Sequence, residues 1–143
     1  MRALSIYLAA ALCLVSCSKS PNAPSSTAPY SQLDILVGNG DPAASGQVLT
    51  VNYTGWIYDA SKPDNKGLQF DTSVGATPFV FTLGIGSVIA GWDKGLVGMK
   101  PGGVRRLVVP PSLGYGDIRN NSIPAYSTLV FDVELVGIAP SGS

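Results

Sequence analysis

The sequence predicts an α+β domain in which a curved antiparallel β-sheet of five to six strands wraps around one short α-helix. The first observation is the stretch 128–138, whose alternating apolar and polar residues predict a strand in a sheet with one buried face. The second is the stretch 87–98, which has apolar residues at four-residue spacing and is the obvious element to cover that face. The third is the composition, because 17 glycines and 11 prolines mark many turns.

The strands follow from runs of β-branched, aromatic and aliphatic residues bounded by turn residues. They are predicted at 33–37, 47–56, 69–71, 79–82, 104–109 and 128–138. The segment 58–68 is predicted to be a polar loop. In the last strand, the side chains expected to share the buried face are Leu129, Phe131, Val133 and Leu135.

The predicted helix carries Val88, Trp92 and Leu96 on one apolar face. Gly91 and Gly95 interrupt it, and a glycine costs about 1 kcal/mol relative to alanine in a helix. We therefore expect a short helix whose stability depends on packing against the sheet.

Charge and composition exclude several classes of function. Nine Lys and Arg balance nine Asp and Glu, so no basic excess is present to bind nucleic acid through its phosphates. The absence of histidine excludes imidazole bases, His-containing triads and His-ligated metals. Both cysteines, Cys13 and Cys17, lie in the first 20 residues, so the body of the chain has neither a disulfide nor a thiol nucleophile. No metal or cofactor is expected.

The first 31 residues indicate export and anchoring. After Arg2, residues 3–15 form an apolar run that is too short to span a bilayer, which needs about 20 residues, but has the length of a secretory signal. The sequence before Cys17 resembles a bacterial lipoprotein signal, which implies lipidation of Cys17; an ordinary signal peptide with a chance cysteine is the alternative. We divide the chain into a signal peptide (1–16), a Ser/Pro-rich tether (17–31) and a folded domain (32–143).

The lipoprotein interpretation places the protein on a membrane of the cell envelope, at its periplasmic face. Ser18 stands where inner-membrane lipoproteins typically carry an aspartate, which favours the outer membrane. Several acyl chains hold a protein on a membrane far better than one, because each buried CH₂ adds about 0.8 kcal/mol.

Eight runs of residues, in order along the chain, make the sequence resemble the FKBP-type peptidyl-prolyl isomerase family. The resemblance covers roughly Gln32 to Ile138. The runs are VNYTG (51–55), FDTS (70–73), PFVFTLG (78–84), VIAGWDKGL (88–96), GMKPGG (98–103), RRLVVPP (105–111), LGYG (113–116), and IP (123–124) with TLVFDVEL (128–135).

This resemblance implies an apolar pocket between sheet and helix. Trp92 would form its floor, and the residues assigned to catalysis are Tyr53, Asp71, Trp92, Tyr115 and Phe131. Those assigned to substrate binding are Phe70, Phe79, Val88, Ile89 and Ile123. Tyr53, Phe79 and Phe131 would be walls, Val88 and Ile89 the rim, and Tyr115 and Ile123 would lie on an overhanging loop.

The implied reaction is rotation about X-Pro peptide bonds, whose barrier is about 18–20 kcal/mol. The twisted amide has less charge separation than the planar one, so a dry apolar pocket favours it over water. The resemblance suggests that the Ile89 N–H and the Tyr115 hydroxyl meet the two carbonyls beside the proline ring. Asp71 would orient the Tyr53 hydroxyl and would not act as a general base, because the reaction moves no proton.

Without the resemblance, these residues have simpler interpretations. Trp92 and Phe131 would be core residues, and Tyr53 and Tyr115 ordinary amphipathic surface tyrosines. Phe79 and Phe81 alternate on one strand, so we expect only one to face the pocket and Phe81 to be plain packing.

The charged residues and the departures from the family pattern give further expectations. Of Arg105 and Arg106, one is expected to be solvated and the other to pair with an acid. Residues 72–78 lack the arginine that many family members place there, so we expect the Tyr53–Asp71 pair to be less firmly held. Ser87 replaces a commonly acidic or Gln position at the rim.

The expected partners are proline-containing polypeptides, macrolide immunosuppressants such as rapamycin as inhibitors, and a membrane through the lipid anchor. The domain is expected to be monomeric. The alternative to an isomerase is a membrane-tethered binding module or chaperone that grips proline-containing chains with little turnover.

Overall fold

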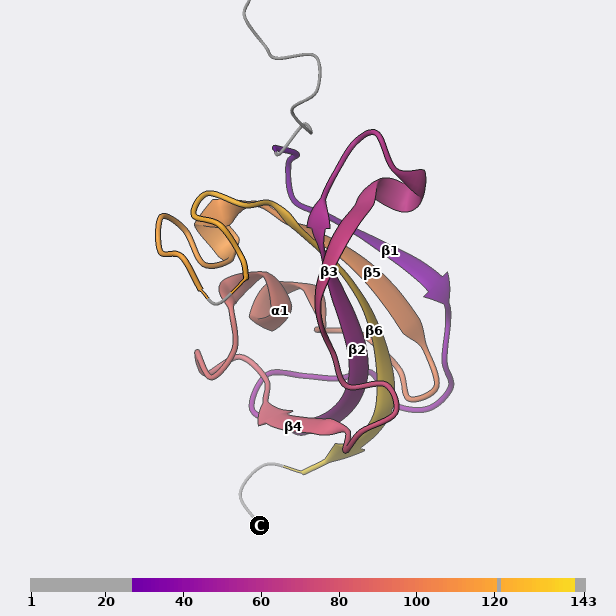
Figure 1. Cartoon of the computed structure of the whole chain (residues 1–143). Helices are drawn as coiled ribbons and strands as arrows, with labels where there is room; N and C mark the ends of the chain where they lie inside the picture. Colours follow the sequence, from indigo (N-terminus) through magenta and orange to yellow (C-terminus); the bar gives the residue numbers. More distant parts are fainter. Residues whose placement is uncertain (1–26, 121, 141–143) are drawn as a thin grey trace, which may run out of the picture.

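The computed structural model describes residues 27–120 and 122–140 (Figure 1). The predicted signal peptide, the lipidation site Cys17 and residues 17–26 of the predicted tether lie outside these residues. The strands are β1 (Ser31–Leu36), β2 (Val48–Tyr58), β3 (Lys66–Thr72), β4 (Phe79–Thr82), β5 (Val104–Val109) and β6 (Leu129–Ala139). The helices are α1 (Ala90–Gly95) and two 3-10 turns, Pro63–Asn65 and Pro111–Leu113.

The six strands form one antiparallel sheet in the order β1-β5-β6-β2-β3, with β4 also paired to β2. This confirms the predicted fold class. The free edge of β2 is divided between two partners: Val48–Val51 pair with β4, and Thr54–Tyr58 pair with β3. Tyr53 lies at the division, where its backbone N–H and C=O bond instead to the hydroxyl and backbone N–H of Ser73. The sheet therefore splays open at Tyr53.

Helix α1 lies in the curve of the sheet (Figure 1). Its six residues are half the stretch that the apolar spacing predicted. Gly91 and Gly95 allow a close approach to β5, since a Cβ would come within 2.6 Å of the Val109 side chain at Gly91 and within 2.7 Å of Leu107 at Gly95. The two glycines thus set how tightly the helix packs on the sheet, as well as limiting its length.

The core lies between α1 and the concave face of the sheet. In β6, Leu129, Phe131, Val133 and Leu135 are buried as predicted, and Glu134 and Val136 on the opposite face are exposed, although Val130 on that face is buried too. Leu49 and Val51 of β2 and Leu107 and Val109 of β5 complete the same buried face. Within residues 27–120 and 122–140, no helix is long and apolar enough to cross a membrane.

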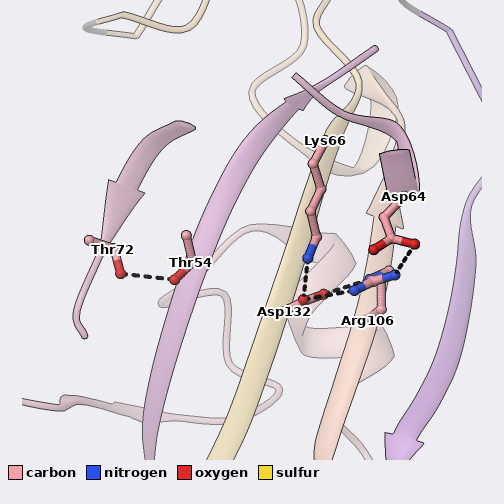
Figure 2. A network of polar contacts seen from close by, with 6 residues as sticks. All are labelled: Thr54, Asp64, Lys66, Thr72, Arg106 and Asp132. Atoms are coloured by element: carbon pink, nitrogen blue, oxygen red, sulfur yellow. Dashed lines mark hydrogen bonds and ion pairs between the residues drawn. The ribbon is translucent and has the colours of Figure 1, made fainter. Parts of the chain in front are cut away.

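The outer face of the sheet carries a network of charges (Figure 2). The Asp132 carboxylate on β6 receives Arg106 of β5 at 2.7 Å and Lys66 of β3 at 2.7 Å, and Arg106 also pairs with Asp64 at 3.3 Å. The Arg106–Asp64 ion pair links the loop that contains Asp64 to the sheet. Strand β3 begins at Lys66, three residues before the predicted start, and Lys66 pairs there with Tyr58 of β2.

The expectation that one of the two arginines is solvated was wrong. Arg105 is buried and pairs with Asp34 of β1 at 2.6 Å, while its guanidinium also donates to the carbonyls of Gly95 and Val97. Arg105 therefore joins the edge strand, the central sheet and the end of α1. A buried cation requires such partners, because an unpaired one is costly to desolvate.

Candidate functional site

A pocket of about 170 Å³ opens between strands β2, β3, β4 and β6, helix α1, the loop before α1 and the loop after β5. It brings together nine of the ten pocket residues expected from the sequence: Tyr53, Phe70, Asp71, Phe79, Val88, Ile89, Trp92, Tyr115 and Phe131. Ser87 is the tenth lining residue; the resemblance placed it at the rim, although it was not among the ten residues assigned to catalysis or substrate binding.

Trp92 is the centre of an aromatic cluster. The rings of Tyr53 and Phe131 meet it nearly edge-on, with centroids at 5.2 and 5.3 Å. Phe79 approaches at 6.2 Å, again nearly perpendicular. Edge-to-face contacts of this kind hold rings in defined orientations. Trp92 is 4% exposed, so both interpretations hold: it belongs to the core, and its upper surface lines the pocket.

Phe79 and Phe81 illustrate a correct expectation with a wrong reason. Phe81 is buried and does not line the pocket, whereas Phe79 does. However, residues two apart on a strand share a face, and these two rings are stacked, 5.6 Å apart at 22°. The two rings differ in how deeply they are buried: Phe81 lies in the core, and Phe79 lies at the pocket wall.

Tyr53 and Asp71 form a polar pair in the lining of the pocket. The Tyr53 hydroxyl donates to Asp71 at 2.5 Å, and the other carboxylate oxygen of Asp71 accepts from the Thr72 N–H at 2.9 Å. The pair forms although no Lys or Arg among the described residues makes an ion pair with Asp71. Burial, followed by the hydrogen bond to Asp71 and its charge, raises the pKa of Tyr53 above the ordinary value. The tyrosine therefore stays neutral and remains the donor.

Tyr115 supplies a second hydroxyl at the pocket mouth. Burial, and then the charge of Asp71, raise the pKa of Tyr115, while a hydrogen bond with Asn120 acts in the opposite direction. Its hydroxyl is thus protonated at neutral pH and able to donate. Ile89, another lining residue, directly precedes α1, and its backbone N–H finds no acceptor among the described residues.

Residues 83–89, between β4 and α1, form the rim of the pocket and are called the rim loop here. A carboxylate of helix α1 holds this loop in place. The Asp93 side chain accepts hydrogen bonds from the backbone N–H groups of Gly84 at 2.7 Å and Gly86 at 2.9 Å. Both glycines have positive φ, +86° and +80°, which other residues rarely adopt. This arrangement determines the path of the loop that presents Ser87, Val88 and Ile89 to the pocket.

Ile123 does not line the pocket as expected. It is 4% exposed and belongs to the core, with one surface in a neighbouring hollow of about 190 Å³. Its backbone is pinned by reciprocal hydrogen bonds with Asn120, at 2.8 and 3.1 Å. These two bonds fix the position of Ile123 relative to Asn120.

The site offers apolar surface and neutral hydroxyl donors. The part of the chain that the structure describes contains no group of three or more His, Cys, Asp and Glu residues placed to hold a metal ion. Such a site can bind a compact apolar ring against Trp92 and present hydrogen-bond donors to carbonyls beside it.

Comparison with known proteins gives one family. The model of the FKBP-type peptidyl-prolyl cis-trans isomerases matches residues 40–136. The chain is 46% identical over 108 residues to FK506-binding protein 1 of Aspergillus oryzae, covering 73% of this chain and 93% of that protein. It is 42% identical over 107 residues to the FK506-binding protein of Neisseria meningitidis serogroup B, covering 73% and 92%.

Solved structures agree. FkpA from Escherichia coli matches with a TM-score of 0.67 and 36% identity, over 79% of this chain and 49% of that one. AtFKBP13 matches with a TM-score of 0.65 and 37% identity, over 80% and 96%.

Proposed function

The chain belongs to the FKBP-type peptidyl-prolyl cis-trans isomerases, and we propose that the pocket above Trp92 is where it binds proline and rotates the X-Pro bond. The proline ring lies on the Trp92 indole between the rings of Tyr53, Phe79 and Phe131. The Tyr115 hydroxyl and the Ile89 N–H meet the carbonyls on either side of the ring.

The physical basis is selective binding of the twisted amide. Rotation breaks amide resonance and removes charge separation, so the twisted bond loses less solvation than the planar bond when it enters an apolar pocket. Donors fixed in place add to the rate only where they fit the twisted geometry better. Asp71 acts through Tyr53, whose hydroxyl it orients.

The observation that carries this proposal is the convergence of nine expected residues from four strands, the helix and two loops around one hollow. The test is binding of a Leu-Pro peptide and of rapamycin, followed by NMR of the backbone amide resonances. The relatives are named FK506-binding proteins, and we propose that macrolides of this type compete with the peptide here. Trp92→Ala should abolish binding of both ligands.

Trp56→Ala is the matched control. Trp56 lies on β2 but packs on the outer face, with the Lys66 ammonium 4.1 Å from its ring centroid. This variant should bind peptide and rapamycin as the unchanged chain does. Binding that survives Trp92→Ala in a folded protein would place the site elsewhere.

We also propose that the protein is exported, acylated at Cys17 and anchored to the envelope as a monomer. The support is the apolar run 3–15, the lipoprotein-like residues before Cys17 and the Ser/Pro-rich stretch that follows. Its substrates would then be exported proteins. Cys17→Ser should give a protein that leaves the membrane fraction, and unchanged fractionation would refute the anchor. Sedimentation of the unlipidated variant tests the monomer.

A further inference from the structure

The chain has a single asparagine that is followed by glycine, Asn39, in the connection between β1 and β2. Both Asn39 and Gly40 are exposed. Gly40 has a φ of +105°, a conformation that a residue with a side chain rarely adopts. A Cβ built on Gly40 would have no atom nearer than 3.7 Å, so nothing packs tightly against this residue and its backbone nitrogen is open to approach.

The reactive groups of this dipeptide have no partners within the described part of the chain. The Gly40 backbone N–H makes no hydrogen bond with the described residues, and neither does the Asn39 side-chain amide. The Asn39 backbone N–H, in contrast, donates to the Pro101 carbonyl at 2.9 Å, which holds the residue beside the turn that contains Pro101. The Gly40 nitrogen and the Cγ atom of Asn39 are therefore free to react with each other.

The other asparagines that the structure describes are held differently. Asn52 lies on β2, and the backbone N–H of the next residue, Tyr53, is bonded to a serine hydroxyl at 2.9 Å. Asn65 is followed by Lys66, whose backbone N–H is bonded to the carbonyl of residue 63. Asn120 is followed by a second asparagine, whose side chain hinders approach to its nitrogen. Asn39 is thus the described asparagine whose following nitrogen is both unbonded and unhindered.

We propose that Asn39 is a site of spontaneous deamidation. The Gly40 nitrogen attacks Cγ of Asn39: the N–Cγ bond forms, the Cγ–Nδ2 bond breaks, and the Gly40 amide proton leaves with the side-chain nitrogen as ammonia. The product is a cyclic imide, a succinimide. Solvent water opens it at Cγ to give an aspartyl residue, or at the backbone carbonyl carbon to give an isoaspartyl residue, whose main chain runs through Cβ and Cγ.

The isoaspartyl product alters the contact between two loops. Residues 38–43 lie along residues 98–103, and three backbone hydrogen bonds of 2.7 to 2.9 Å join the two segments. A Cβ at Gly38 would lie 2.2 Å from the Pro101 carbonyl oxygen, so the two backbones are in close contact. An isoaspartyl residue lengthens the main chain by one carbon within this contact and loosens it. An aspartyl residue keeps the normal main chain and only adds a charge.

The modification lies away from the proline pocket. None of residues 38–43 lines that pocket, and neither does any of residues 98–103. The isoaspartyl protein should therefore lose stability while its isomerase activity at moderate temperature is unchanged. The inference does not depend on the proposed function, because the modification is detected by mass and not by turnover.

The test incubates the purified chain at physiological temperature and pH. Peptide mass spectrometry detects the replacement of NH₂ by OH at each asparagine, and enzymatic methylation labels isoaspartyl residues. Product should accumulate at Asn39 well ahead of Asn52, Asn65 and Asn120. The isoaspartyl form, separated by ion exchange, should melt about 4 °C lower, the shift that the net loss of one hydrogen bond produces in a domain of about 100 residues.

Two variants of Asn39 separate charge from main-chain length. Asn39→Asp adds the charge but keeps the normal main chain, so it should melt close to the unmodified protein. Asn39→Gln keeps the amide, but its longer side chain closes a larger ring more slowly. This variant should show no product at residue 39 over the same incubation, and its melting temperature should not change with time. A synthetic peptide of residues 35–43 provides the unfolded reference.

Each outcome decides one part of the proposal. Deamidation in the peptide but not in the folded chain would show that the turn protects Asn39, and would overturn the proposal. Equal product at Asn39, Asn52, Asn65 and Asn120 would overturn the role given to the free Gly40 nitrogen. An isoaspartyl form that melts like the unmodified protein would overturn the loosening of the two loops. Turnover that falls in step with the modification would contradict its separation from the pocket.

Discussion

The Tyr53 hydroxyl donates a hydrogen bond to the Asp71 carboxylate at 2.5 Å and so joins β2 to β3 where the sheet splays open. Tyr53→Phe keeps the ring against Trp92 but removes this bond. We expect a loss of about 1 kcal/mol in the free energy of unfolding and a several-fold fall in kcat/KM, because Asp71 no longer orients a hydroxyl. Chemical denaturation and peptide isomerisation measure the two effects.

Tyr58→Phe is the control for that variant. Tyr58 lies on the same strand, and its hydroxyl makes no hydrogen bond with the described residues. Activity should be unchanged. An equal loss of activity in the two variants would show that the Tyr53–Asp71 bond has no special role.

The two hydrogen bonds by which the Asp93 carboxylate holds the rim loop give a second prediction. Asp93→Ala removes both acceptors from the Gly84 and Gly86 N–H groups, which frees the loop that carries Val88 and Ile89. We expect KM to rise more than kcat falls, with a stability loss of about 1 kcal/mol because the bonds are exposed. Asp117→Ala, in another exposed loop, should change neither constant. An unaltered KM in Asp93→Ala would contradict a role for these two hydrogen bonds in substrate binding.

The charge network on the outer face of the sheet makes the free energy of unfolding depend on pH in the acidic range. Burial alone would raise the pKa of Asp132, but hydrogen bonds from Arg106 and Lys66 and their charges hold it below its usual range. A carboxyl with a lowered folded-state pKa stabilises the fold above its unfolded pKa of about 3.9, and this contribution disappears as pH falls through the folded-state pKa. The free energy of unfolding should therefore drop below about pH 4.

Asp132→Asn tests this directly by denaturation at several pH values. The variant should be less stable at pH 7, because Arg106 and Lys66 lose their anion, and its stability should fall less steeply in acid. Parallel curves for the variant and the unchanged chain would contradict the assignment.

The two raised tyrosine pKa values predict a flat pH profile for catalysis. Tyr53 and Tyr115 have folded-state pKa values above the ordinary value of 10.0, so both stay protonated through neutral pH. Turnover should be constant between about pH 6 and 9, and Tyr115→Phe should lower it severalfold with little change in stability. A bell-shaped profile within this range would indicate a proton transfer that the account does not contain.

Much of the fold could be predicted because it is local. The alternation of Leu129, Phe131, Val133 and Leu135 determines which face of β6 is buried, and strand β5 matches its predicted range, 104–109. The pocket residues could be predicted because eight runs of residues resemble a known family. In each case the signal lies in consecutive residues.

The remaining features depend on contacts between distant segments. The partner of Arg105 is Asp34, on an edge strand 71 residues away, and no local pattern reveals that pairing. Lys66, at the early start of β3, pairs with Tyr58 of β2 and forms an ion pair with Asp132, which lies 66 residues away on β6. The position of Ile123 follows from its backbone hydrogen bonds with Asn120, and no residue pattern in this segment indicates those bonds.

The most direct test of the central claim is the isomerisation rate of a Leu-Pro peptide, measured without protease, with and without rapamycin. We predict a rate well above the uncatalysed one, whose waiting time is tens to hundreds of seconds. When rapamycin fills the pocket above Trp92, the rate should return to the uncatalysed value. A rate equal to that in buffer, or an acceleration that saturating rapamycin leaves unchanged, would contradict this prediction.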